Sequence, residues 1–185
     1  MGKIINSTFV SIDGVINHME AWHFSYIDDE TARITLEQIT ASDALLMGRH
    51  TYEAYAGAWP QREGAYPTKI NSIRKYVVST TLDKADWNNT TVIKGDLVAE
   101  VAKLKQQGGD ILMHGFGPVA NTLMANGLLD ELHLWVHPHF AGVGGPADLL
   151  LNEGNNARLE LIGTRALKSG VVLLSYQVPA TDSSA

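Results

Sequence analysis

The sequence of 185 residues contains no cysteine. A chain without thiols forms no disulfide, no thiolate metal site and no cysteine nucleophile. The sequence also lacks an excess of basic residues, because 14 Lys and Arg stand against 20 Asp and Glu and give a formal net charge of −6. Proteins that bind nucleic acid usually carry a basic surface, so this balance argues against a nucleic-acid partner.

Long hydrophobic runs are absent as well. No run approaches the roughly 20 residues of a membrane-spanning helix, and residues 1–7 have neither the apolar core nor the cleavage site of a secretory signal. We therefore expect a soluble, cytoplasmic protein with no membrane partner. Hydrophobic residues still make up 45% of the chain, which is enough for one packed core. Without repeats or long linkers, we expect a single domain over residues 1–178 and a flexible polar tail over 179–185.

Short apolar runs alternate with helical patterns along the chain. Strands are predicted over residues 3–11, 44–47, 75–79, 90–93, 111–113, 131–136, 159–167 and 171–178. Helices are predicted over residues 28–41, 49–55, 96–107 and 118–126. In the first helix, Ala32, Leu36 and Ile39 are expected to form the apolar stripe. This order predicts a three-layer α/β fold, with a mostly parallel central sheet, helices on both faces and an antiparallel C-terminal hairpin.

Two turns that lead from a strand into a helix contain glycine. The first is Gly48-Arg49-His50-Thr51, and the second is Gly115-Phe116-Gly117-Pro118. Free N–H groups and the positive end of the dipole at a helix start suit a phosphate group. Two such turns on neighbouring strands would suit a pyrophosphate, although glycine also permits a tight turn in any α/β domain. The G-x-G-x-x-G fingerprint and the P-loop are both absent, so neither standard nucleotide site is present.

These segments resemble the dihydrofolate reductase superfamily. More narrowly, they resemble the small stand-alone proteins related to the C-terminal reductase domain of the bifunctional riboflavin biosynthesis deaminase-reductase. The resemblance runs from Lys3 to Val178 and rests on the order of five segments: FVSIDGVI at 9–16, LMGRHTYE at 46–53, KYVVSTTL at 75–82, GFG at 115–117 and GLLDELHL at 127–134. The deaminase half is missing, because the chain has no cysteine and no H-x-E with P-C-x-x-C.

The resemblance implies a dihydrofolate reductase-like fold and an NADPH-dependent oxidoreductase. Its substrate would be a small heterocycle (pterin- or pyrimidine-like) or a carbonyl or imine compound. Dihydrofolate reductase and 5-amino-6-(5-phosphoribosylamino)uracil reductase act on substrates of this kind. Family members often form homodimers through their C-terminal strands, so we expect a homodimer. The alternative hypothesis is a non-catalytic nucleotide-binding protein on the same scaffold.

The resemblance also assigns residues to the cofactor, NADPH. The guanidinium of Arg49 would meet the 2′-phosphate, which it can bind through parallel hydrogen bonds. The loop over residues 13–16 would close over the nicotinamide, and the bulky Phe116 would stack on the cofactor or narrow its path. The full set is Ile16, Gly48, Arg49, His50, Thr51, Ser79, Thr80, Thr81, His114, Gly115, Phe116, Gly117, Pro118 and Val119.

The resemblance implies one catalytic carboxylate at the start of the first helix, where Asp29 stands. The competing interpretation is that Asp29 only complements the helix dipole. Substrate contacts are expected from four aromatic residues, which could equally pack in the core: Trp22, Phe24, Tyr52 and Trp59.

The histidines of residues 131–139 allow two interpretations. His133, His137 and His139 share strand parity and could bind zinc or copper. Pro138 interrupts the strand and no carboxylate ligand is evident, so we expect no metal site and place these rings at a dimer interface. His114, beside the second glycine turn, would make either a structural hydrogen bond or a contact with nicotinamide or substrate.

Overall fold

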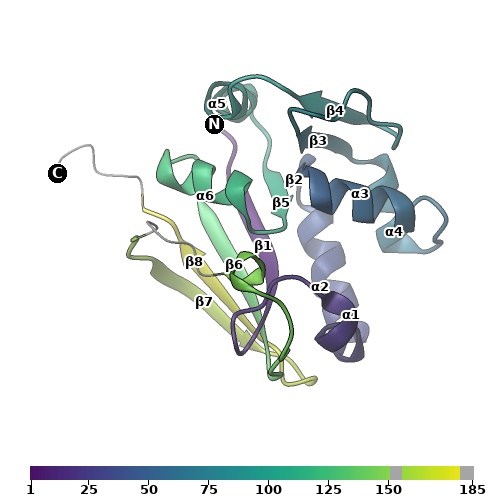
Figure 1. The fold of residues 1–185 in the computed structure, drawn as a ribbon, viewed down its shortest axis with the longest axis vertical. Helices are drawn as coiled ribbons and strands as arrows, with labels where there is room; N and C mark the ends of the chain where they lie inside the picture. The colour runs from purple at the N-terminus through teal and green to yellow at the C-terminus, as the bar shows by residue number, and fades with distance from the viewer. Residues whose placement is uncertain (151–155, 180–185) are drawn as a thin grey trace.

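A computed structural model describes residues 1–150 and 156–179 (Figure 1). Apart from Pro179, the predicted flexible tail lies outside the described residues. The strands are β1 (Ile4–Ser11), β2 (Ala44–Gly48), β3 (Arg74–Val78), β4 (Thr90–Ile93), β5 (Ile111–His114), β6 (Glu131–His137), β7 (Glu160–Ala166) and β8 (Val172–Gln177). The α-helices are α1 (Met19–Trp22), α2 (Asp29–Thr40), α3 (Arg49–Ala58), α4 (Ala65–Ser72), α5 (Leu97–Gln107) and α6 (Pro118–Ala125). Two short 3-10 helices are η1 (Phe24–Tyr26) and η2 (Pro146–Asp148).

The described strands form one eight-stranded sheet in the order β4-β3-β2-β5-β1-β6-β8-β7. The six strands from β4 to β6 are parallel, and β8 and β7 complete the edge as an antiparallel hairpin. This confirms the predicted mostly parallel sheet with its C-terminal hairpin. In the described part of the chain, no helix combines the length and the apolar character that crossing a bilayer requires.

Consecutive residues of β2 show how the sheet is covered on both faces. Leu46 packs into the cluster that contains Val101 of α5, whereas Leu45 and Met47 pack into the cluster that contains Ile39 of α2. All three β2 side chains are fully buried. Because side chains alternate along a strand, α5 and α6 must cover one face and α2 and α4 the other (Figure 1). The prediction of helices on both faces is therefore confirmed.

Two helices begin as their sequences predict. The carboxylate of Asp28 accepts a hydrogen bond from the Thr31 backbone N–H at the start of α2. The carboxylate of Asp96 accepts the N–H groups of Val98 and Ala99 at the start of α5. Each cap satisfies donors that a helix start leaves unpaired.

Other local predictions were wrong. In the predicted apolar stripe of α2, Ile39 is buried and Leu36 packs beside it, but Ala32 is exposed, and Thr31 and Ile34 are buried instead. Residues 65–72 form α4, where no helix was predicted. Pro67 lies in the first turn of α4, where its missing N–H breaks no helical hydrogen bond.

Two buried histidines join β6 to the segment between α1 and η1. His137 Nδ1 lies 2.8 Å from the Trp135 carbonyl oxygen and must carry the proton that it donates there. His137 Nε2 is then the acceptor for His23 Nδ1, 3.0 Å away. The exposed fractions are 1% for His137 and 5% for His23. Burial and, to a smaller extent, the nearby His137 lower the pKa of His23 to about 4.

This pair predicts acid-sensitive stability. The unfolded chain takes up a proton on His23 near its ordinary pKa, but the folded protein does so only near pH 4. The free energy of unfolding should therefore be highest above pH 6.5 and fall by about 3 kcal/mol between pH 6.5 and 4 because of this group. Denaturant unfolding across that range measures the slope. The variant His23→Asn keeps an N–H donor toward His137 but cannot titrate, so an unchanged slope in this variant would contradict the assignment.

Candidate functional site

The two glycine turns leave adjacent strands of the sheet. Met47 of β2 pairs with His114 of β5, and Gly48 pairs with Val78 of β3. Both turns and the segment after β3 therefore lie at the carboxyl edge of the sheet. In open α/β sheets, ligands usually bind outside the carboxyl ends of the strands.

Glycine is required where the two turns meet. Gly115 has a φ of 80°, and a Cβ built there would lie 2.5 Å from Thr51 Oγ1. A Cβ at Gly48 would lie 3.6 Å from a methyl group of Val119. The start of α3 therefore packs directly against the turn that precedes α6.

The helices that start at these turns have no side-chain cap. Gly48 and Gly117 occupy the cap positions of α3 and α6, and neither helix has an acidic residue in its first turn. By contrast, aspartates cap α2 and α5. A further uncapped start occurs at α4, so this feature alone does not define a site. The two uncapped starts at the carboxyl edge are distinguished by their contact with each other, which places two sets of N–H donors side by side.

Arg49 is held at the start of α3 by two side chains. Its Nε lies 2.7 Å from Glu53 Oε1, and its Nη1 donates to the hydroxyl of Thr81. The structure thus brings together Arg49 and Thr81, both of which had been assigned to the cofactor. Ser79 is buried, and its hydroxyl accepts the N–H groups of Thr81 and Leu82, which shapes the loop after β3. His50 and Thr80 are exposed at the same edge.

Phe116 points into the core rather than into the turn. Its exposed fraction is 9%, and it belongs to the same hydrophobic cluster as Ile16 and Ala120. The turn itself is fixed from β1, because Asn6 Nδ2 donates to the Gly115 carbonyl oxygen at 2.9 Å. A Cβ built at Gly117 meets no atom within 4 Å, so space remains open beside the backbone there.

The loop that was expected to close over the nicotinamide is tied down. The carboxylate of Asp13 accepts the hydroxyl of Ser11 and the N–H groups of Ala141 and Gly142. These hydrogen bonds lower the pKa of Asp13 to about 2. Further along, the Ile16 N–H donates to the Asp148 carbonyl oxygen at 2.8 Å. Ile16 is buried in the same hydrophobic cluster as Phe116.

A row of aromatic side chains extends from the end of β5 along α3. The Tyr55 hydroxyl lies 3.2 Å from His114 Nδ1, and Tyr55 also makes an edge contact with Trp59, at 6.0 Å between ring centres. The Arg62 guanidinium lies 4.9 Å above the Trp59 ring. The sequence analysis missed Tyr55. Helical spacing could have found it, because Tyr55 is one turn beyond Thr51 and shares its face of α3.

The other predicted ligand contacts lie apart from this row. Trp22 is buried and donates its indole N–H to the Asn17 carbonyl oxygen. Tyr52 is buried in the core beside Trp87. Phe24, 59% exposed, and Asp29, also exposed, lie at or near the start of α2. The structure therefore joins Trp59 to His114 through Tyr55 but leaves Trp22 and Tyr52 in the core.

The histidines of β6 are covered by their own chain. His133 contacts Gln38 of α2 and Glu131, and His137 contacts His23. The expectation that His133 and His137 line a dimer interface is wrong, because helices of the same chain already occupy that face. Among the described residues, no cluster of His, Cys, Asp or Glu could hold a metal ion.

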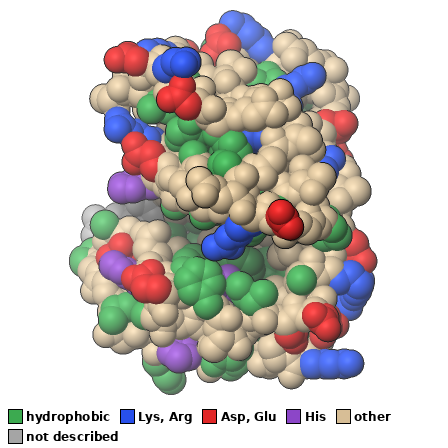
Figure 2. Space-filling view, turned by 90° about the vertical axis from the view of Figure 1, so that its right-hand side faces the viewer, with side chains coloured by type: hydrophobic (Ala, Val, Ile, Leu, Met, Phe, Trp, Pro, Cys, Tyr) green, Lys and Arg blue, Asp and Glu red, His purple; other side chains and the backbone are tan. Residues whose placement is uncertain are grey.

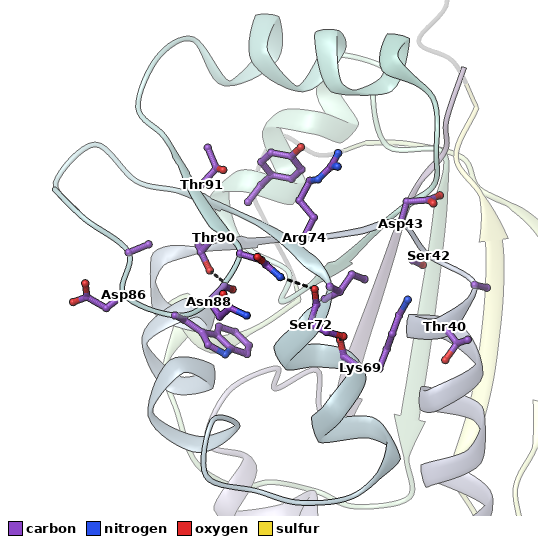
Figure 3. Close-up of a pocket in the computed structure, with 16 residues that line it drawn as sticks. Thr40, Ser42, Asp43, Lys69, Ser72, Arg74, Asp86, Asn88, Thr90 and Thr91 are labelled. Carbon is purple, nitrogen blue, oxygen red and sulfur yellow. Dashed lines mark hydrogen bonds between the residues drawn. The ribbon is translucent and has the colours of Figure 1, made fainter.

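The large cavity shown in Figure 3 lies at the opposite edge of the sheet. Its volume is about 990 Å³, and polar residues at the start of β2, β3 and β4 line it, among them Asp43, Arg74 and Thr90. These are the amino ends of the strands, away from both glycine turns. On another face, the space-filling view shows a hollow with hydrophobic side chains gathered in it, running across the middle of the molecule (Figure 2). We place the candidate site at the carboxyl edge because the uncapped helix starts converge there.

Known proteins resemble this chain over most of its length. The family model of the RibD C-terminal domain matches residues 2–173. The uncharacterized protein YyaP of Bacillus subtilis (strain 168) is 31% identical over 182 residues, which are 94% of each chain.

Solved structures resemble the fold. A putative riboflavin biosynthesis protein from Shewanella sp. PV-4 superposes with a TM-score of 0.75 and 21% identity, covering 97% of this chain and 99% of its own. A pyrimidine reductase-like protein from Corynebacterium diphtheriae gives a TM-score of 0.68 at 14% identity, covering 96% of this chain and 92% of its own. At these identities, the two structures support the fold alone.

The glycine turns yield a matched pair of substitutions. In Gly115→Ala, the new Cβ meets Thr51 and the backbone keeps an unfavourable φ, so the free energy of unfolding should fall by about 1–3 kcal/mol. In Gly117→Ala, the φ of −171° is extended and the space is open, so the loss should stay below about 1 kcal/mol. Denaturant unfolding of both variants measures the difference. Equal losses would mean that the two turns do not abut as described.

Proposed function

The chain belongs to the family of the RibD C-terminal domain, and from that premise we propose that it is an NADPH-dependent reductase. Its substrate is a small pterin- or pyrimidine-like heterocycle, or a carbonyl or imine compound. The observation that carries this proposal is the contact between two uncapped helix starts on adjacent parallel strands. A pyrophosphate between them would receive N–H groups from both helices.

The residues at the carboxyl edge fit a phosphorylated dinucleotide. The Arg49 side chain, about half exposed, stands beside Thr81 and can turn toward a 2′-phosphate. The open space at Gly117 allows a phosphate to approach the backbone. Thr51 offers a hydroxyl at the junction of the two turns. We therefore assign the adenosine-side phosphates to α3 and the pyrophosphate to the contact between α3 and α6.

In the proposed reaction, the cofactor and the protein have separate roles. A bound nicotinamide supplies the hydride, while the protein binds, orients and excludes water. The buried Phe116 and Ile16 provide an apolar wall beside the second turn. The aromatic row of Tyr55 and Trp59 gives a flat ring a surface on which to pack.

One observation favours the second candidate, a non-catalytic nucleotide-binding protein. Asp29, the carboxylate assigned to catalysis, is exposed at the first position of α2. At that position a negative charge also stabilises the helix without any catalytic role. Following NADPH absorbance with pterins, pyrimidines and quinones separates the candidates, because the reductase consumes NADPH and the binding protein only retains it.

We also propose that the protein is a homodimer. Leu161 and Ile162 are 53% and 50% exposed on β7, which forms the outer edge of the sheet. Exposed apolar side chains on an edge strand favour association. Sedimentation velocity tests this directly, and a monomer at micromolar concentration would contradict it.

The assignment of Arg49 predicts selectivity between cofactors. Arg49→Ala should weaken NADPH binding by about tenfold or more, because a charged hydrogen bond to the 2′-phosphate is lost. NADH lacks that phosphate, so its binding should change much less. Tryptophan fluorescence titration with both cofactors measures the two affinities.

A control for Arg49→Ala is available on α2. Arg33 makes the same helical ion pair with Glu37, four residues on, as Arg49 makes with Glu53. Arg33→Ala should therefore change neither affinity. Equal losses of NADPH and NADH in Arg49→Ala would reject the 2′-phosphate role, and no binding by the wild type at millimolar NADPH would reject the proposed function.

A further inference from the structure

We propose that His114 is a specificity-determining residue that donates a hydrogen bond from Nε2 to a ring carbonyl oxygen of a flat heterocyclic substrate. This inference rests on the proposed reductase function and narrows its substrate class. His114 is the last residue of β5 and directly precedes Gly115, so its side chain belongs to the carboxyl edge.

The hydrogen bond to Tyr55 fixes the protonation pattern of His114. Across the described residues, the Tyr55 hydroxyl has no hydrogen-bond partner other than His114 Nδ1, at 3.2 Å. Because Nδ1 is the one acceptor that the described residues offer to the hydroxyl hydrogen, we take Tyr55 as the donor. Nδ1 is then the acceptor, and the single proton of the neutral ring is on Nε2. Burial lowers the pKa of His114 to about 4 and raises the pKa of Tyr55 to about 12, so both groups are uncharged near neutral pH.

The Nε2 atom of His114 has no hydrogen-bond partner in the described part of the chain, and the residue as a whole is half-buried. In the described part of the chain, the only buried side-chain nitrogen or oxygen without a hydrogen bond is Ser169 Oγ. His114 Nε2 has no partner there either, so this atom is not fully buried. The histidines of β6 differ, because both ring nitrogens of His133 and of His137 are engaged within the protein. One nitrogen of His114 is thus held by Tyr55, and the other is available to a ligand.

The surroundings of His114 suit a flat ring that accepts a hydrogen bond. Tyr55 lies edge-on to His114, with 5.8 Å between ring centres, and Trp59 and Tyr66 continue the aromatic row. These rings offer apolar surface, while the unpaired N–H of His114 offers a donor. A donor fixed in position selects a carbonyl oxygen and rejects an amino group at the same place, because two donors facing each other leave both unpaired. The substrate class is therefore a planar heterocycle with a ring carbonyl.

Two pteridines test this inference in protein saturated with NADP⁺. Lumazine carries two ring carbonyls, and 2,4-diaminopteridine carries amino groups in their place. Fluorescence titration gives the dissociation constant of each. Wild type should bind lumazine more tightly, and His114→Leu should weaken lumazine by about three- to tenfold while changing 2,4-diaminopteridine by less than about twofold.

Variants separate a hydrogen bond from a loss of packing. The amide nitrogen of Gln stands close to the position of His Nε2, so His114→Gln should recover most of the lumazine affinity that His114→Leu loses. Tyr55→Phe removes the group that fixes the ring and should give an intermediate loss. Thermal unfolding of each variant, together with its NADPH affinity, reports whether the site remains folded.

The outcomes distinguish this inference from the proposed function. If the wild type does not bind NADPH, the proposed function is rejected. If NADPH binds, then absence of lumazine binding rejects the role of His114. The role of His114 is also rejected if wild type and His114→Leu bind lumazine with equal affinity, or if His114→Leu loses equal affinity for lumazine and 2,4-diaminopteridine.

Discussion

The contact between Gly115 and Thr51 is the constraint on which the site depends. Only a residue without a Cβ lets the turn after β5 approach the first turn of α3 so closely. That approach turns two ordinary strand-to-helix connections into one surface, with two helix dipoles directed at the same region. The parallel pairing of β2 with β5 brings the two connections to the same edge of the sheet. Asn6 on the neighbouring strand β1 holds the second turn through its hydrogen bond to the Gly115 carbonyl oxygen.

Side-chain capping distinguishes α2 and α5 from the two helices that begin at the glycine turns. Aspartates begin α2 and α5 and satisfy their first N–H groups within the chain. Glycines begin α3 and α6 and leave those groups free. A side-chain cap would stabilise each of these helices by about 1 kcal/mol. The absence of a cap weakens the isolated helix but keeps its first backbone N–H groups available to an anion. This pattern is expected where a binding site is built at a cost in stability.

Local chemistry explains which features were readable from the sequence. Asp28, Asp96 and Pro118 act on neighbouring residues, so the starts of three helices were predicted correctly. The glycine turns were also predicted, since each consists of a short apolar run, a glycine and a helix start that follow one another along the chain. Long-range packing was not readable. The pairing of Tyr55 with His114 links residues 59 positions apart, and the core positions of Trp22 and Phe116 depend on neighbours from other elements. An aromatic residue in a loop looks the same in sequence whether it faces a ligand or the core.

Asp13 holds the segment after β1 in a fixed position. The side-chain carboxylate of Asp13 ties the segment after β1 to Ala141 and Gly142, far along the chain, by accepting one backbone N–H group from each. A segment held in this way is a fixed wall and not a mobile flap. This segment then adds no gating step of its own to ligand entry at the candidate site, and the residence time of a bound product depends on the strength of its contacts.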